Sequence, residues 1–221
     1  MNDQNIEVES STLVQKTVIW LHGLGADGND FASLVPELQL PSSCGIRFIF
    51  PHAPVIPITI NNGYNMRAWY DIQTFSFDDR IDHQGIAKSM AHIHTLIKNE
   101  MTRGITESNI ILAGFSQGAV MALVTGLTYP RQLGGIIALS GYLPDAEGFL
   151  AKASAANQHS PIYIAHGTQD PIVPYSLGER TSALLRERAY PVTWQSFSMP
   201  HSVCKEEILG IGQWLQKRFH H

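Results

Sequence analysis

A serine flanked by glycines follows a short apolar run in the middle of the chain. The run is Ile110–Ala113, the motif G-F-S-Q-G occupies residues 114–118, and a helix-like pattern comes next. In a strand–turn–helix of this kind the turn is so sharp that the residues two before and two after the serine must lack side chains. The serine is then exposed at the strand tip, facing the amino end of the helix. The pattern predicts that Ser116 is a nucleophile.

A serine hydroxyl needs a base to take its proton and an acid to hold that base. With this motif the acid, and then the histidine, follow the serine along the chain. We expect His201 to be the base, because it lies between the last strand-like run and the last helix-like run. We expect Asp170 to be the acid, because it is the only carboxylate in the loop after Ile162–Ala165. His166 is interpreted as a structural histidine and His159 as a solvent-exposed one.

A glycine-rich loop near the start of the chain is suited to bind a developing negative charge. It reads L-H-G-L-G-A-D-G over residues 21–28 and follows a strand-like run. The oxyanion formed in acyl transfer needs two preorganised N–H donors. We assign one to the backbone of Gln117, directly after the nucleophile, and the other to the backbone of Leu24 in this loop. A phosphate-binding loop is the alternative, but the spacing matches neither G-x-G-x-x-G nor G-x-x-x-x-G-K-[ST].

Strand-like and helix-like segments alternate along the chain and must position these residues. The expected strands are Thr17–Leu21, Arg47–Phe50, Ile110–Ala113, Ile136–Leu139, Ile162–Ala165 and Thr193–Phe197. Helices are expected over residues 84–102, after Ser116, over about 177–188 and over 205–219. This alternation predicts an α/β fold with right-handed βαβ units and a mostly parallel central sheet flanked by helices. Active sites in such sheets lie beyond the carboxyl ends of the strands.

One segment, residues 54–77, interrupts the alternation. It combines two prolines, the turn-like N-N-G at 61–63 and a dense set of apolar and aromatic residues with little charge. A connection of this length is usually functional or disordered, and its hydrophobicity argues against disorder. We expect a short antiparallel excursion that forms an apolar flap over the site.

Composition and charge exclude several classes of protein. The chain has 221 residues, of which 44% are hydrophobic and 15% charged, which fits a single domain over residues 1–221 with elements buried on both faces. A net charge of −4 without a basic run predicts that nucleic acid is not a partner. No apolar stretch approaches the length of a membrane span. The histidines lack metal-ligand spacing, so we expect no metal and no cofactor.

The cysteines and the amino terminus bear on location. Cys44 and Cys204 are far apart in the chain and are expected to be reduced thiols. The first residues are polar and acidic and lack the pattern of a signal peptide, so we expect a cytoplasmic protein. The terminal pair His220-His221 is either native or a tag remnant and carries no argument.

Four segments in this order and spacing resemble a known family. The segments L-H-G-L-G-A-D-G, G-F-S-Q-G, H-G-T-Q-D-P-I-V-P and M-P-H-S-V are similar to those of the acyl-protein thioesterase, carboxylesterase and lysophospholipase branch of the α/β-hydrolases, over about residues 18–219. The resemblance implies an α/β-hydrolase fold. It also implies a catalytic triad of Ser116, Asp170 and His201, with Leu24 and Gln117 in the oxyanion hole. The long insertion resembles that of bacterial-type members, whose loop is thought to act as a mobile flap.

The resemblance also extends to an acyl-binding region. The stretch R-A-W-Y-D-I at 67–72 is similar to the family's loop beside the acyl channel, although Trp69 and Ile72 are equally suited to complete the core. Together with the apolar insertion, this leads us to expect the substrate-binding residues Ile56, Ile58, Met66, Trp69, Tyr70, Ile72 and Leu143.

The expected function is a serine carboxylesterase or thioesterase that cleaves acyl esters or thioesters, including those of the lysophospholipase type, through an acyl-enzyme. Two alternatives stay open from the residues: a small peptidase, and a catalytically silent acyl-binding protein on the same fold. The expected partner is the acyl ester or thioester substrate. A homodimer and a transient contact of the flap with a membrane surface are further expectations that the sequence does not decide.

Overall fold

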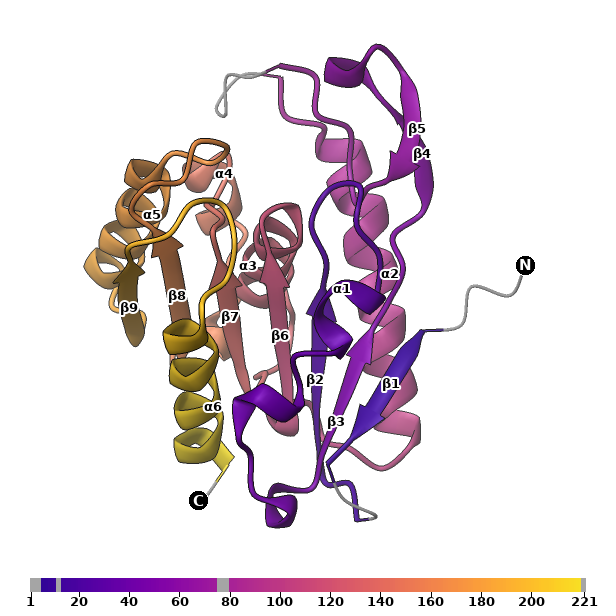
Figure 1. Cartoon of the computed structure of the whole chain (residues 1–221), viewed down its shortest axis with the longest axis vertical. Coiled ribbons are helices and arrows are strands. Elements are labelled where there is room, and N and C mark those ends of the chain that lie inside the picture. The colour runs from indigo at the N-terminus through magenta and orange to yellow at the C-terminus, as the bar shows by residue number, and fades with distance from the viewer. Residues whose placement is uncertain (1–4, 11–12, 75–79, 220–221) are drawn as a thin grey trace.

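The computed structural model describes residues 5–10, 13–74 and 80–219. Its centre is a seven-stranded sheet with the strand order β1-β3-β2-β6-β7-β8-β9 (Figure 1). Strand β1 is antiparallel to β3, whereas the other neighbouring pairs are parallel. The strands are β1 Ile6–Glu9, β2 Lys16–Leu21, β3 Ile46–Phe50, β6 Ile110–Phe115, β7 Gly135–Leu139, β8 Ile162–Gly167 and β9 Val192–Phe197.

Helices cover both faces of this sheet. Successive side chains of a strand point to opposite faces, so Ile110 of β6 enters one core and Ile111 enters the other. The first core packs against α2 (His83–Thr102), α3 (Gln117–Thr128), α4 (Ala146–Leu150) and α5 (Tyr175–Glu187). The second packs against α1 (Asn29–Ala32) and α6 (Lys205–Phe219). Burial on both faces explains why these strands have no polar alternation in the sequence.

The predicted elements correspond to observed ones with small shifts at their ends. Helix α2 begins at His83, one residue before the prediction, because the Asp82 carboxylate accepts a hydrogen bond from the Gly85 N–H at 2.8 Å and caps the helix. The helix ends before Gly104, whose φ of +92° suits a residue without a side chain. Strand β1 was not predicted, since four residues with alternating burial become a strand only by pairing with β3. Short 3₁₀ helices occupy Pro36–Leu38, Ser42–Cys44, Thr59–Asn61, Glu107–Asn109 and Ala155–Asn157.

The insertion forms a two-stranded hairpin beyond the carboxyl-end edge of the sheet (Figure 1). Strand β4 (Val55–Ile58) is antiparallel to β5 (Tyr64–Arg67), and the chain reverses through Asn62 and Gly63, both with positive φ. The predicted antiparallel excursion is therefore correct over residues 55–67, whereas residues 75–77 lie outside the described part of the chain. Val55 and Tyr64 are exposed at 59% and 70%, so the hairpin presents apolar surface to solvent.

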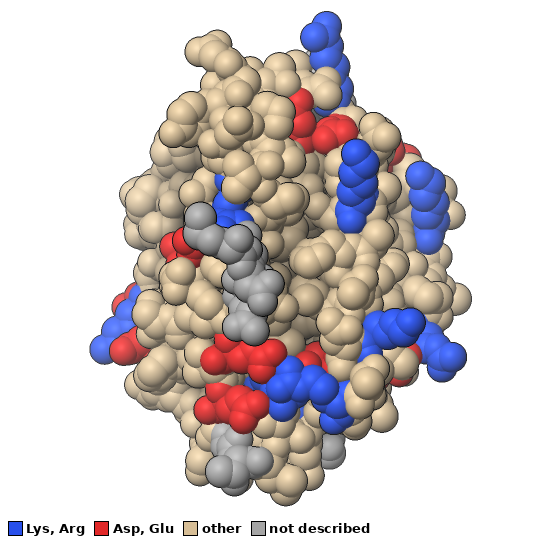
Figure 2. All heavy atoms as spheres, turned by 90° about the vertical axis from the view of Figure 1, so that its right-hand side faces the viewer, with Lys and Arg blue, Asp and Glu red and all other residues tan. Residues whose placement is uncertain are grey.

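Charged side chains of opposite sign lie close together. Buried Glu100 accepts hydrogen bonds from Arg47 at 2.9 Å, Arg103 at 3.0 Å and Thr17 at 2.6 Å, which links α2 to β2 and β3. On the face drawn in Figure 2, acidic and basic side chains gather side by side toward the lower end.

Within the described ranges, no helix is long and apolar enough to cross a bilayer. Nor do three or more His, Cys, Asp or Glu side chains of those ranges cluster as metal ligands would.

Candidate active site

Ser116 occupies a strained turn between β6 and α3. Its φ of +54° and ψ of −118° are unusual for a residue with a side chain and are typical of functional positions. The flanking glycines are required by close approach. A Cβ at Gly114 would lie 2.1 Å from the Gly118 carbonyl oxygen, and one at Gly118 would lie 2.2 Å from the Leu21 carbonyl oxygen. The turn predicted from the motif is therefore the one that the backbone adopts.

His201 connects Ser116 to Asp170. The His201 Nε2 atom lies 2.9 Å from the Ser116 hydroxyl, and its Nδ1 atom lies 2.6 Å from Asp170 Oδ2. Because a carboxylate accepts, Nδ1 carries the proton and Nε2 is free to accept from the serine. The other carboxylate oxygen of Asp170 accepts from the N–H groups of Ile172 and Val173, at 2.8 and 2.9 Å. The Asp170 side chain is fully buried and that of His201 is 15% exposed.

His166 supports the acid loop and does not contact the serine. It is fully buried, and its Nε2–H donates to the Val173 carbonyl at 2.9 Å while lying 3.3 Å from Asp170 Oδ2. Burial lowers the pKa of His166, so the ring is neutral at physiological pH. This agrees with its interpretation as a structural histidine, and His159 is exposed as expected.

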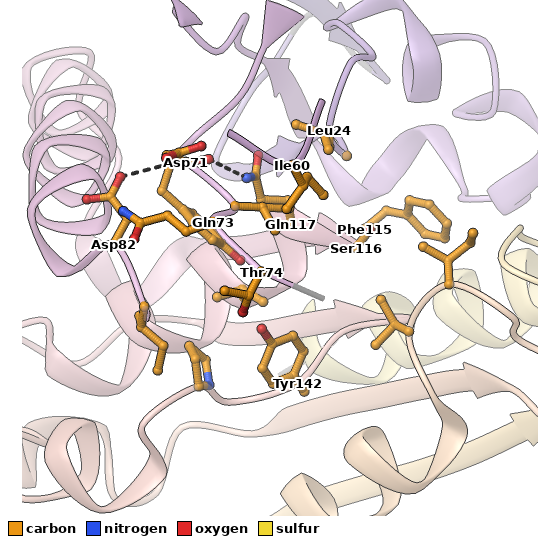
Figure 3. Close-up of a pocket in the computed structure, with 18 of the residues that line it drawn as sticks. Leu24, Ile60, Asp71, Gln73, Thr74, Asp82, Phe115, Ser116, Gln117 and Tyr142 are labelled. Atoms are coloured by element: carbon orange, nitrogen blue, oxygen red, sulfur yellow. Dashed lines mark hydrogen bonds between the residues drawn. The ribbon is translucent and has the colours of Figure 1, made fainter. Parts of the chain in front are cut away.

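The two predicted oxyanion residues face the same cavity as Ser116. Gln117 is the first residue of α3, so its N–H has no acceptor within the helix. Leu24 lies on the glycine-rich loop, which approaches the nucleophile so closely that a Cβ at Gly23 would lie 3.4 Å from the Ser116 Cβ. Leu24, Ser116, Gln117 and His201 all line one pocket (Figure 3).

That pocket has a volume of about 340 Å³ and mostly apolar walls. Its apolar lining consists of Leu24, Ala26, Ile60, Tyr70, Ile72, Ile81, Phe115, Val120, Tyr142, Pro144, Ile172 and Val173. Away from Ser116 it reaches polar side chains, among them Asp71, Gln73 and Asp82 (Figure 3). An apolar cavity with a nucleophile at one end suits an acyl chain.

The structure places two of the seven residues predicted to bind the acyl chain in the pocket lining. Tyr70 and Ile72 line the pocket, whereas the pocket lining does not include Ile56, Ile58, Met66, Trp69 or Leu143. The reason is side-chain direction. Ile58 is fully buried at the end of hairpin strand β4. Trp69 and Leu143 are packed in the core, where the Leu143 N–H donates to the Thr181 hydroxyl.

Some wall residues that the sequence did not single out come from other loops, and one comes from the insertion itself. Tyr142 follows the carboxyl end of β7, Ile172 follows the acid Asp170, and Ile60 lies in the turn after β4. Loops at the carboxyl ends of parallel strands are where such walls are expected. That rule was available in the sequence and would have pointed to Tyr142 and Ile172.

The parallel sheet, the nucleophile turn and the Ser–His–Asp arrangement define this chain as an α/β-hydrolase. Residues 2–219 match the phospholipase/carboxylesterase family model, and the chain belongs to that family. The chain is 42% identical over 213 residues to acyl-protein thioesterase 1 of Neurospora crassa, covering 91% of this chain and 86% of that protein. It is 40% identical over 181 residues to acyl-protein thioesterase 1 of Schizosaccharomyces pombe, covering 82% and 80%.

Solved structures agree with this assignment. Arabidopsis thaliana SOBER1 superposes with a TM-score of 0.86 at 29% identity, covering 92% of this chain and 98% of that one. Zea mays acyl-protein thioesterase 2 superposes with a TM-score of 0.86 at 28% identity, covering 98% and 99%. The predicted fold class, family and hydrolase class are confirmed. The closer likeness to bacterial-type members stays a prediction.

Proposed function

We propose that this chain hydrolyses acyl esters and thioesters through an acyl-enzyme at Ser116. His201 acts as the general base, and the Asp170 carboxylate orients it. One observation carries the proposal. A continuous chain of hydrogen bonds runs from Asp170 through His201 to the Ser116 hydroxyl, and that hydroxyl opens onto the apolar pocket. The family membership and the names of the relatives support the same class of substrate.

The geometry supports a two-step reaction. His201 Nε2 accepts the hydroxyl proton as the Ser116 oxygen attacks the acyl carbonyl, and the carbonyl electron pair moves onto oxygen. The N–H groups of Leu24 and Gln117 stabilise this oxyanion. The protonated His201 then gives its proton to the leaving alcohol or thiol, which leaves the acyl group on the serine. In the second step a water molecule attacks the acyl carbonyl while His201 accepts its proton. His201 then returns a proton to the Ser116 oxygen, and the fatty acid is released.

The pocket favours acyl groups over peptides. Its walls offer apolar side chains along the path that leads away from Ser116, which suits a hydrocarbon chain. Each buried methylene contributes up to about 0.8 kcal/mol, so kcat/KM should rise with chain length until the pocket is full. A comparison of p-nitrophenyl acyl esters with peptide amides tests the peptidase alternative. Turnover of any acyl ester that depends on Ser116 argues against the silent acyl-binding alternative.

Ser116→Ala tests the nucleophile. We expect kcat to fall by about 10⁴-fold or more, because the members of a triad act as one unit. Ser108→Ala offers a matched control. Ser108 is exposed and precedes the amino end of β6, whereas Ser116 follows the carboxyl end of the same strand. Intact-mass measurement after treatment with a phosphonate should show one adduct on the wild type and the control, and none on Ser116→Ala. An adduct on any other residue would overturn the assignment.

The interactions and location of the protein remain proposals with separate tests. Contact of the hairpin with a membrane surface is supported by exposed Val55 and Tyr64, and co-sedimentation with vesicles tests it. A cytoplasmic location is supported by the free thiols of Cys44 and Cys204, and cell fractionation tests it. A homodimer stays a prediction that light scattering decides.

A further inference from the structure

Trp69 belongs to the hydrophobic core, which is one of the two places expected for it, and its polar atoms make three hydrogen bonds at the back of the active site. Its indole N–H donates to the His22 carbonyl at 2.9 Å, and its backbone N–H donates to the Gln117 side-chain oxygen at 2.8 Å. Its carbonyl accepts from the Ser89 hydroxyl. The residue is 1% exposed, so each of these groups would be costly to leave unpaired.

Two of these bonds reach the two sides of the proposed oxyanion hole. On one side, the Gln117 side chain accepts from the Trp69 N–H and donates to the Tyr70 carbonyl at 2.8 Å. This pair of bonds attaches the first residue of α3 to the backbone of residues 69 and 70. The backbone N–H of that same glutamine is the donor assigned next to the nucleophile, so its position depends on this attachment.

On the other side, the orientation of the Leu24 N–H depends on His22. The Ala53 N–H donates to His22 Nε2 at 3.0 Å, so His22 carries its proton on Nδ1 and donates it to the Gly23 carbonyl at 2.7 Å. In a trans peptide the C=O and the following N–H point in opposite directions. Holding the Gly23 carbonyl against His22 therefore turns the Leu24 N–H away from it.

The glycine-rich loop has two further ties to the same segment. The Trp69 ring lies against the His22 ring, with centroids 5.3 Å apart. The Gly25 N–H donates to the Arg67 carbonyl at 2.8 Å, two residues before the tryptophan. Burial also lowers the pKa of His22, which keeps the ring neutral and preserves its acceptor nitrogen.

We propose that Trp69 is a positioning residue that fixes the two N–H donors of the oxyanion hole relative to each other. It does so by binding the His22 backbone on one side and the Gln117 side chain on the other. The proposal rests on the proposed function, because it assumes the oxyanion hole of Leu24 and Gln117. It explains why a tryptophan of the insertion is buried behind the site when other residues of the same insertion line the pocket.

Trp69→Phe removes the indole N–H and keeps most of the apolar volume. Removing one oxyanion donor outright costs about 10²–10³-fold in kcat, so loosening one should cost less, about 10-fold. We expect KM to stay within about twofold, because the pocket walls are untouched. Gln117→Met is a second variant that removes both side-chain bonds and keeps the backbone donor. This variant should also lower kcat, and it keeps the proposal testable if Trp69→Phe fails to fold.

A trifluoromethyl ketone reports on the oxyanion hole itself. The Ser116 oxygen adds to the ketone carbon, its proton moves to His201, and the carbonyl electron pair becomes an alkoxide that the two N–H groups bind. With active enzyme counted by phosphonate titration, the inhibition constant should weaken by the same factor as kcat/KM falls. The acid limb of the pH–rate profile should keep its position, because His201 is untouched.

Trp214→Phe is the matched control. Trp214 lies on α6 and packs against Tyr163 and Gly135. Gly135 is the first residue of β7, at the amino ends of the strands, whereas Ser116 lies at their carboxyl ends. This variant should keep the kcat and the inhibition constant of the wild type. An unchanged kcat in Trp69→Phe, or a lower kcat with unchanged inhibitor binding, would overturn the positioning role. Full activity of Ser116→Ala would instead overturn the proposed function.

Discussion

The two sides of the active-site pocket are built differently. On the reaction side, Ser116, Asp170 and His201 each follow the carboxyl end of a parallel strand. The acid is held by hydrogen bonds that it accepts from the N–H groups of Ile172 and Val173. On the binding side, the insertion contributes Ile60 and residues 70–74 to the pocket from outside the sheet. The difference indicates that the sheet positions the triad, whereas part of the pocket wall comes from a segment inserted between two elements of the sheet.

Asp170→Asn should alter the reaction side alone. An amide cannot hold His201 in the required tautomer, so kcat should fall by roughly 10³–10⁴-fold. The ratio of kcat/KM for octanoyl and acetyl esters should not change, because the pocket walls are intact. Glu147→Gln, at a glutamate with a 79% exposed side chain, is the control and should behave as the wild type. Near-normal turnover of Asp170→Asn with a normal Tm would mean that another acid holds His201.

The double change Ile60→Ser and Ile72→Ser should alter the binding side alone. Both residues line the pocket, and their polar replacements should lower kcat/KM for octanoyl esters by about 10- to 100-fold. Hydrolysis of acetyl esters should be nearly unaffected, because the triad is untouched. A chain-length series of p-nitrophenyl esters measures this.

Ile56→Ser is the matched control for that experiment. Ile56 lies on β4 of the same insertion and is also half-buried, but it does not line the pocket. It should leave the chain-length dependence unchanged. Equal losses on acetyl and octanoyl esters in the double variant would mean that the insertion only supports the fold.

Glu207→Gln should change the stability of the fold and leave both the reaction side and the binding side of the pocket intact. Glu207 lies in the first turn of α6, six residues after His201, and is fully buried. Burial raises the pKa of Glu207 to about 8. The unfolded chain releases this proton near its ordinary pKa, so the free energy of unfolding should fall as pH rises from about 4.5 to 8. At pH 7 the loss is about 3 kcal/mol.

The glutamine variant should remove that pH dependence. We expect its Tm to exceed that of the wild type at pH 8 and to approach it at pH 5, with kcat unchanged throughout. Thermal unfolding followed over this pH range measures the effect. Parallel curves for the two proteins would show that Glu207 does not titrate in this range. Substitution of exposed Glu206 by glutamine provides the control for a change of net charge.

The sequence by itself determined the reaction side of this protein. The glycines around Ser116 are required by backbone contacts that any such turn makes, so the motif predicted the local structure. The acid and the base could be named because the carboxyl ends of parallel strands meet at one edge of a sheet, wherever the intervening helices lie. The strands themselves were predictable, since burial on both faces leaves continuous apolar runs. That residues 1–221 form a single domain stays a prediction.

Only the tertiary structure decided the binding side. Ile58, Ile60 and Trp69 are all apolar residues of one insertion. The first is fully buried, the second lines the pocket, and the third donates its indole N–H to the His22 carbonyl. Composition does not distinguish these roles, because they depend on where each side chain points after the hairpin packs against the sheet edge. Edge strand β1 was missed for a related reason, as its four residues gain strand structure only from a partner distant in the sequence.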